Sequence, residues 1–336
     1  MPVSRFVSGA SGLRLTAEEK RFFAQTRPFG LILFRRNIAD RDQIRALCDE
    51  FRDAVGRDAP ILVDQEGGRV QRLTVPNWRK IPSAARVAAA AVTGGDAIAR
   101  MSGRVLAADL REVGITIDCA PCLDLSIPGQ SDVIGDRSFG ADPETVARLG
   151  RATAEGLLAG GVLPVIKHMP GHGRALVDSH LGLPVVETSR AELEATDFVP
   201  FRRLADLPAA MTAHIVFTAL DPSQPATTSA RVIAEIVRGH IGFGGLLFSD
   251  DVSMGALAGS LAERSRRCLD AGCDLVLHCN GDLAEMHQVA GEAGPLDGES
   301  ARRAEMALAA VGDPDDADVE ALRIRLDEAV AALPSA

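Results

Sequence analysis

Two adjacent carboxylates, Asp250 and Asp251, stand at the end of the apolar run Leu246–Phe248. A carboxylate at the end of a buried strand can attack an electrophilic carbon, such as the anomeric carbon of a glycoside. Aspartate is also a common N-cap, and because two aspartates are adjacent, one can face a pocket while the other caps the next helix. These residues alone leave both roles open.

A second candidate for catalysis is Asp178-Ser179-His180, in a segment that also contains Gly171 and Gly173. A carboxylate two residues from a histidine can orient the ring and raise its pKa, so that the imidazole exchanges a proton near neutral pH. The glycines predict a shaped loop that can move as a lid. A solvated turn without catalytic function is the alternative.

Lys167 and His168 suit the binding of a polar ligand, because they end the apolar run Leu163–Ile166. The chain has only three lysines, which makes a lysine at such a position informative. A charged group on a buried strand needs a polar partner, and Asp64, Asp250 or substrate hydroxyls would serve. A purely structural ion pair is the alternative.

The histidines of this region can also be interpreted as a metal site. Its ligands would be His168, His172, Asp178 and His180. Pro170 lies between the first two histidines and breaks any helix that would place them on one face. We therefore expect neither a metal nor another cofactor.

The elements that must position these residues repeat along the whole chain. Eight short apolar runs occur at Val3–Ser8, Leu31–Phe34, Ile61–Val63, Ile115–Cys119, Leu163–Ile166, Ala210–Ile215, Leu246–Phe248 and Asp274–Leu277. Amphipathic stretches separate them, for example Asp40–Val55, Asp96–Val113, Asp142–Gly156, Arg190–Leu204 and Arg231–Arg238. Continuous apolar runs are typical of parallel strands covered on both faces. The pattern predicts an α/β fold, a (β/α)₈ barrel formed as one domain by residues 1–336, with a helical tail from Pro295 along the barrel wall.

A doubly wound open sheet is the alternative fold, but no G-x-G-x-x-G turn follows any of the runs. In a barrel the carboxyl ends of the strands meet on one face. Polar residues gather after these runs, including Asp64, Arg137 in the loop after the fourth run, and five of the seven histidines. An arginine fork suits hydroxyl, amide or carboxylate groups. This clustering predicts a catalytic pocket.

Composition excludes several classes of function. The formal net charge of −10 argues against nucleic-acid binding. Neither a secretory signal nor an apolar run of membrane-spanning length is present, so we expect a cytoplasmic protein without a membrane partner. Cys119 and Cys122 follow an apolar run, and we expect them to be reduced thiols in or near the core.

Four stretches together resemble the glycoside hydrolase family 3 β-N-acetylglucosaminidases, in particular the single-domain NagZ type. They are Leu62–Arg72 (LVDQEGGRVQR), Gly135–Phe139 (GDRSF), Lys167–Gly173 (KHMPGHG) with Asp178-Ser179-His180, and Phe248–Met254 (FSDDVSM). Phenylalanine is the commoner residue at the position of Met169 in this family. The resemblance extends from near the N-terminus to about residue 280.

The resemblance implies a role for each matched residue. Asp250 looks like the catalytic nucleophile, His180 like the general acid/base, and Asp178 like its partner. Five others resemble the sugar-binding set, namely Asp64, Arg72, Arg137, Lys167 and His168. Two-domain β-glucosidases of the family usually take their acid/base from a second domain, so the Asp178-x-His180 loop favours an N-acetylglucosaminidase.

By the same resemblance, the substrate is N-acetylglucosamine β-1,4-linked to 1,6-anhydro-N-acetylmuramic acid in muropeptides, and cleavage serves peptidoglycan recycling. We expect a retaining hydrolase that acts on this small carbohydrate as a monomer. Two rivals stay open. One is a phosphorylase on the same scaffold, in which phosphate replaces water, and the other is a non-catalytic sugar sensor.

Overall fold

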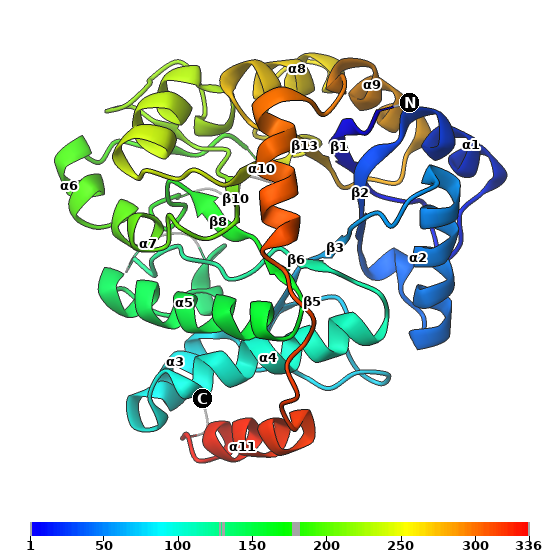
Figure 1. The fold of residues 1–336 in the computed structure, drawn as a ribbon. Coiled ribbons are helices and arrows are strands. Elements are labelled where there is room, and N and C mark those ends of the chain that lie inside the picture. Colours follow the sequence, from blue (N-terminus) through cyan, green and yellow to red (C-terminus); the bar gives the residue numbers. More distant parts are fainter. Residues whose placement is uncertain (1, 128, 130–131, 177–181, 335–336) are drawn as a thin grey trace.

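The computed structural model describes residues 2–127, 129, 132–176 and 182–334, and its centre is a barrel of parallel strands (Figure 1). Strands β7 and β8 stand at the two ends of the hydrogen-bonding order and are separated only by Val165, so they form one barrel strand. That strand pairs with β6 on one side and with β10 on the other, which closes the barrel. The barrel strands are β1 (Ser4–Ser8), β2 (Pro28–Leu33), β3 (Ile61–Val63), β6 (Ile117–Asp118), β7 (Leu163–Pro164) with β8 (Ile166–Met169), β10 (Ala209–Thr212), β12 (Leu246–Asp251) and β13 (Leu275–His278).

Each of the eight predicted runs coincides with one of these barrel strands, and the predicted (β/α)₈ fold is confirmed. Side chains alternate along the strands between two buried surroundings. Val7, Leu62 and Phe248 belong to the cluster inside the barrel. Phe6 and Ile61 pack in the larger cluster between the barrel and its helices. Because both faces are covered, the strands are apolar at nearly every position.

Helices surround the barrel on its outside (Figure 1). They include α1 (Ala17–Thr26), α2 (Arg41–Val55), α3 (Ala84–Gly94), α4 (Ala97–Glu112), α5 (Pro143–Ala159), the π-helical η4 (Val232–His240), α8 (Leu261–Ala271) and α9 (Leu283–Ala293). The single helix expected over Arg190–Leu204 is wrong, since α6 (Arg190–Ala195) and α7 (Phe198–Arg203) are separate. The break lies at Thr196, whose φ of −128° and ψ of −84° are not helical, and the buried carboxylate of the next residue, Asp197, accepts a hydrogen bond of 2.6 Å from Arg174 Nε.

The C-terminal tail contains α10 (Gly298–Ala309) and α11 (Val319–Ala331). We expected the whole tail to lie along the barrel wall. Of its two helices, α11 does so and packs beside α4 (Figure 1). Helix α10 crosses the amino-terminal opening of the barrel, where Ala304 and Ala307 pack into the interior cluster. The tail therefore covers the end of the barrel opposite to the predicted pocket. None of the helices in the described ranges has both the length and the hydrophobicity to cross a membrane.

Candidate active site

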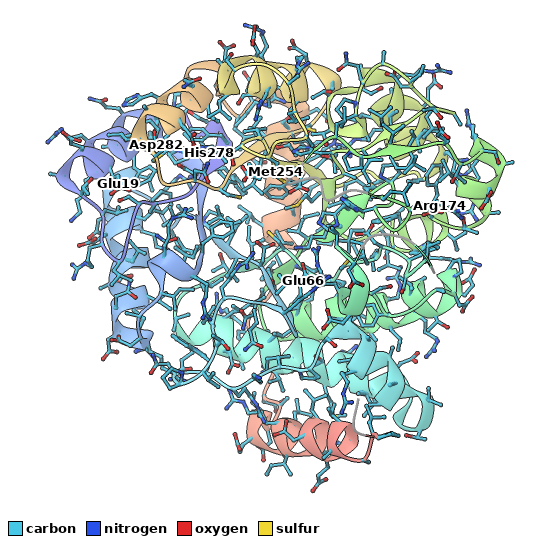
Figure 2. All side chains as sticks on the ribbon, turned by 180° about the vertical axis from the view of Figure 1, so that it is seen from behind. Glu19, Glu66, Arg174, Met254, His278 and Asp282 are labelled. Carbon is cyan, nitrogen blue, oxygen red and sulfur yellow. The ribbon has the colours of Figure 1, made fainter. Side chains whose placement is uncertain are left out.

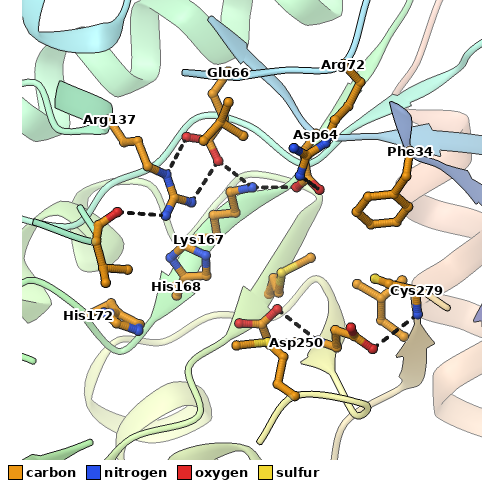
Figure 3. Close-up of a pocket in the computed structure, with 16 residues that line it drawn as sticks. Phe34, Asp64, Glu66, Arg72, Arg137, Lys167, His168, His172, Asp250 and Cys279 are labelled. Atoms are coloured by element: carbon orange, nitrogen blue, oxygen red, sulfur yellow. Dashed lines mark hydrogen bonds and ion pairs between the residues drawn. The ribbon is translucent and has the colours of Figure 1, made fainter. Parts of the chain in front are cut away.

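A pocket of about 160 Å³ opens among the carboxyl ends of the strands (Figure 3). Glu66 and Met254, which line it, lie near the middle of the molecule when it is seen from the side opposite to Figure 1 (Figure 2). Among the lining residues are the predicted nucleophile and the full predicted sugar-binding set, Asp64, Arg72, Arg137, Lys167, His168 and Asp250. The fold thus brings together side chains that are far apart in the sequence.

One wall of the pocket is a network of opposite charges (Figure 3). Lys167 Nζ lies 2.8 Å from an oxygen of Asp64 and 2.7 Å from an oxygen of Glu66. Arg137 donates from Nε and Nη2 to the two oxygens of Glu66, each at 2.8 Å. Arg72 Nη2 lies 3.2 Å from the other oxygen of Asp64. Asp64 and Asp250 were the carboxylates expected to pair with Lys167. Asp64 does so, but the second carboxylate that binds Lys167 is Glu66 and not Asp250.

Electrostatic coupling keeps this network ionised. Burial alone would lower the pKa of Lys167, but the carboxylates of Asp64 and Glu66 raise it above its usual value. Burial would raise the pKa of Glu66, but Arg137 and Lys167 outweigh burial and lower it to about 2. Each charge therefore holds its neighbour in the charged form, and the wall presents fixed cations and anions to a ligand.

Asp250 lies at the end of β12, half-buried, with its carboxylate in the pocket. Its Oδ1 accepts the backbone N–H of Asp251 at 2.8 Å. Burial would raise the pKa of Asp250, but the neighbouring imidazoles of His214 and His168 lower it below the usual value. The group is therefore ionised at neutral pH, as a nucleophile requires.

Asp251 has a structural role, but it does not cap a helix. Its carboxylate accepts hydrogen bonds from Ser253 N at 3.0 Å, Ser253 Oγ at 2.6 Å and Cys279 N at 3.1 Å. The next helix, α8, begins ten residues later and is capped by Ser260. The expectation of an N-cap at this pair is wrong, because the chain first forms a turn that Asp251 closes.

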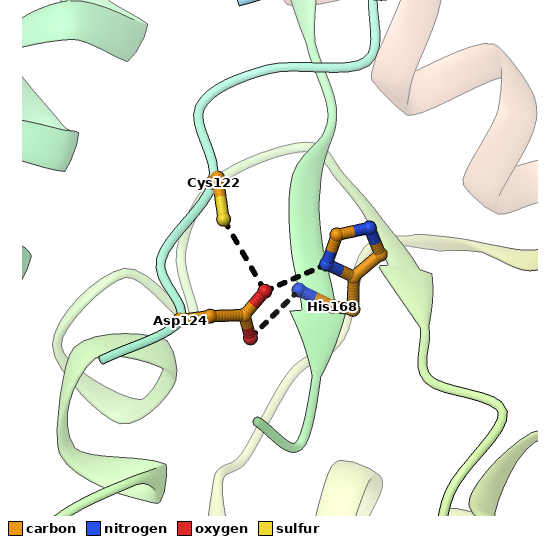
Figure 4. Close-up of side chains that lie close together, drawn as sticks. All are labelled: Cys122, Asp124 and His168. Carbon is orange, nitrogen blue, oxygen red and sulfur yellow. Dashed lines mark hydrogen bonds and ion pairs between the residues drawn. The ribbon is translucent and has the colours of Figure 1, made fainter. Parts of the chain in front are cut away.

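His168 is held by Asp124, which follows β6 (Figure 4). His168 Nδ1 lies 2.6 Å from Asp124 Oδ2, and the thiol of Cys122 donates to the same oxygen at 3.2 Å. These three side chains form the one group within the described residues whose ligand atoms lie close enough to share a metal ion. Two ligands of one zinc ion lie about 3.3 Å apart, since each is about 2.0–2.2 Å from the metal. The shorter separation of 2.6 Å fits a charge-assisted hydrogen bond.

Asp178 and His180 lie outside the described residues, so their predicted roles stay predictions. The described residues on both sides of them are anchored at the pocket face. His172, which lines the pocket, donates its backbone N–H to Asp124 Oδ1 at 2.6 Å. After the segment, β9 (Val185–Val186) pairs with β11 (Val216–Phe217). Strand β11 follows the barrel strand β10 closely in the sequence.

Three residues of the site were not assigned from the sequence, although each stands in a segment that was considered. Glu66 lies two residues after Asp64, and Asp124 follows the fourth apolar run. His214 lies near the end of the sixth run, and its ring hydrogen-bonds to Thr227 Oγ1 at 2.8 Å and to the carbonyl of Asp251 at 3.0 Å. Position after a strand could have selected all three, but their partners come from other parts of the chain. The expected thiols Cys119 and Cys122 are free and buried.

The family model for the glycosyl hydrolase family 3 N-terminal domain matches residues 5–304. A β-hexosaminidase from Alkalilimnicola ehrlichii is 43% identical over 288 residues, which are 83% of this chain and 82% of the relative. Among solved structures, NagZ from Neisseria gonorrhoeae in complex with N-trifluoroacetyl-D-glucosamine has a TM-score of 0.84 and 34% identity, and the match covers 98% of this chain and 97% of that one.

A family 3 β-N-acetylglucosaminidase from Paenibacillus has the same TM-score of 0.84 at 30% identity, covering 97% of this chain and 67% of that one. Sequence and structure thus agree over the barrel and over the strands that carry the pocket residues. The chain belongs to glycosyl hydrolase family 3 and is a glycoside hydrolase.

Proposed function

We propose that the chain is a retaining exo-β-N-acetylglucosaminidase in which Asp250 is the nucleophile. The observation that carries this proposal is the half-buried, ionised carboxylate of Asp250, which shares one pocket with Lys167 and Arg137. Retaining glycosidases need such a carboxylate against the anomeric carbon. The similar β-hexosaminidases and the solved β-N-acetylglucosaminidases support the choice of sugar.

The charged wall is suited to the hydroxyls of a terminal sugar. An ammonium has three N–H donors, and Asp64 and Glu66 occupy two of those of Lys167. Asp64 can accept hydrogen bonds from hydroxyls through its remaining lone pairs, and the imidazole of His168 adds another polar contact. Because these groups are paired with one another before the sugar arrives, binding requires little reorganisation.

The chemistry proceeds in two displacements. A carboxylate oxygen of Asp250 attacks the anomeric carbon while the bond to the leaving oxygen breaks, and His180 gives that oxygen its proton. A glycosyl ester of Asp250 results. His180 then takes a proton from water, the water oxygen attacks the anomeric carbon, and Asp250 leaves as a carboxylate, so the β configuration is restored. Asp178 stabilises the imidazolium form of His180.

We further propose that the whole chain acts as one catalytic domain in the cytoplasm. Its substrate there is N-acetylglucosamine β-1,4-linked to 1,6-anhydro-N-acetylmuramic acid, and its process is peptidoglycan recycling. The similar β-hexosaminidase, and the solved NagZ in complex with N-trifluoroacetyl-D-glucosamine, support the terminal N-acetylglucosamine of this substrate. Purified anhydro-muropeptides with and without peptide are the direct test. Release of free N-acetylglucosamine from them is the expected result, and hydrolysis of aryl glycosides alone would contradict the assignment.

Mass spectrometry after incubation with a 2-fluoro aryl glycoside tests the nucleophile. We expect one added sugar, mapped to the peptide that contains Asp250, and no adduct in Asp250→Asn. An adduct elsewhere, or turnover of the trap without any adduct, contradicts the assignment. Incubation of an aryl N-acetylglucosaminide with and without phosphate separates the hydrolase from a phosphorylase, because only the latter yields N-acetylglucosamine 1-phosphate.

His180→Ala tests the acid/base. Release of a poor leaving group should slow by about 10²- to 10⁴-fold, because general acid catalysis is lost. An activated aryl glycoside needs less protonation and should be affected less. Steady-state kinetics with two aryl glycosides of different leaving-group pKa measure this difference, and equal losses for both would contradict the role.

A further inference from the structure

We propose that Asp124 is a positioning residue of the site: it fixes the orientation and tautomer of His168 and anchors the backbone from which the His180 segment begins. This inference rests on the proposed function for its kinetic consequences only. Asp124 itself is buried and makes no contact with the pocket space, so it acts through the residues that it holds.

The two oxygens of Asp124 receive four hydrogen bonds. Oδ2 binds His168 Nδ1 at 2.6 Å and accepts the thiol of Cys122 at 3.2 Å. Oδ1 accepts the backbone N–H groups of His172 at 2.6 Å and His168 at 3.3 Å. Figure 4 shows the carboxylate lying between Cys122 and His168. One side chain therefore fixes both the ring and the backbone of the strand end.

This contact determines which ring nitrogen of His168 carries a proton. Burial would raise the pKa of Asp124, but His168 and His172 lower it, so the group is a carboxylate at neutral pH. A carboxylate only accepts hydrogen bonds, and Nδ1 of His168 must therefore donate. In the neutral ring, Nε2 is then the acceptor, available to a sugar hydroxyl. Lys167, the preceding residue, can only donate, so the two neighbours present opposite hydrogen-bonding characters.

The second oxygen controls the start of the next segment. The bond from His172 N to Oδ1 holds the chain two residues after Pro170, and Ala175 N bonds back to His172 O at 3.1 Å. Gly173 lies so close to the backbone that a Cβ there would stand 2.2 Å from Leu125 O. Residues 172–175 are thus fixed against residues 124 and 125, and the segment toward His180 begins from a fixed point.

Asp124→Asn isolates the contact with the ring. An asparagine keeps one carbonyl oxygen for His172 N–H but loses the charge and places an amide at Oδ2. Asp118→Asn is the matched control, because Asp118 is an equally buried carboxyl on β6 whose Oδ1 accepts Gln65 N–H. We would record ¹⁵N–¹H long-range correlation spectra of the full chain labelled in histidine, and assign His168 by its loss in His168→Gln.

The expected spectrum shows His168 of the wild type protonated at Nδ1. Asp124→Asn should shift the ring toward the Nε2–H tautomer, whereas Asp118→Asn should leave it unchanged. A proton on Nε2 in the wild type, or an unchanged ring in Asp124→Asn, overturns the proposal. No substrate is used, so this outcome is independent of whether Asp250 is the nucleophile.

Kinetics of the same variants separate positioning from general support of the fold. Asp124→Asn should lower kcat/KM for an aryl N-acetylglucosaminide by about 10- to 100-fold, as expected for the loss of a charge-assisted hydrogen bond. In a His168→Gln background the same change should cost less than about threefold, since residues that act through one another are not additive. Equal losses in both backgrounds would show a merely structural carboxylate and contradict the proposal.

Discussion

The two aspartates at the end of β12 are neighbours in sequence, yet their surroundings differ completely. Asp251 is used by the protein itself, because its carboxylate accepts three hydrogen bonds from Ser253 and Cys279. Asp250 accepts one backbone N–H and otherwise faces the pocket. The difference teaches that a reactive carboxylate can be recognised by how few hydrogen bonds it makes with the described residues around it.

The charged wall across the pocket follows the opposite principle. Asp64, Glu66, Arg137 and Lys167 bind one another in pairs, so their positions are fixed by the protein. A substrate meets groups that are already oriented, and the remaining unpaired donors and acceptors determine what it binds. Substitutions of Asp250, Asp251 and the residues of the charged wall test this difference between the reactive carboxylate and the groups that bind one another.

Asp250→Asn should have the largest effect. An amide cannot form the glycosyl ester, so kcat should fall by about 10⁴-fold or more. Asp251→Asn should reduce kcat by less than about tenfold. It should lower the unfolding free energy by about 1–3 kcal/mol, because the bonds from Ser253 N and Cys279 N lose the charge of their acceptor and the Ser253 hydroxyl loses its acceptor oxygen. Steady-state kinetics and thermal unfolding of both variants measure this. Similar kinetic losses in the two variants would remove the distinction between them.

Glu66→Gln breaks the charged wall at the point where it joins two cations. Loss of the charge-assisted bonds to Arg137 and Lys167 should lower kcat/KM by about 10- to 100-fold. The change should appear mainly as a higher KM, since Glu66 orients binding groups and does not take part in bond making. A kcat that falls as far as kcat/KM, with KM unchanged, would contradict this role.

The same carboxylate predicts how stability depends on pH. Glu66 has a pKa of about 2 in the folded chain, below its ordinary value of 4.5. Its contribution is therefore present above about pH 4.5 and is lost as the pH falls toward 2, and a shift of this size corresponds to about 3 kcal/mol. Denaturant unfolding between pH 5 and 2 should show a shallower loss of stability in Glu66→Gln than in the wild type. Parallel pH profiles would argue against the coupling.

The barrel could be predicted from the sequence because its signal is local. Runs such as Ile61–Val63 are apolar throughout, since both faces of the strand are buried. Residues at strand ends, including Asp64 and Lys167, were found for the same reason. The roles of Glu66 and Asp124 could not be predicted, because Glu66 meets Arg137 and Asp124 meets His168 from distant parts of the chain.

Phe34→Leu tests the edge of the charged wall and should have the smallest effect. The Phe34 ring lines the pocket, and the guanidinium carbons of Arg36 and Arg72 lie 5.2 and 5.1 Å from its centroid. Leucine keeps an apolar side chain but removes both cation–π contacts, each of about 0.5–1 kcal/mol. KM should therefore rise by up to about fivefold, with kcat nearly unchanged, and Phe34→Tyr, which keeps the aromatic face, should lie close to the wild type. If leucine and tyrosine raise KM equally, the ring does not help to hold Arg72 against Asp64, and the position of Arg72 depends on the carboxylate alone.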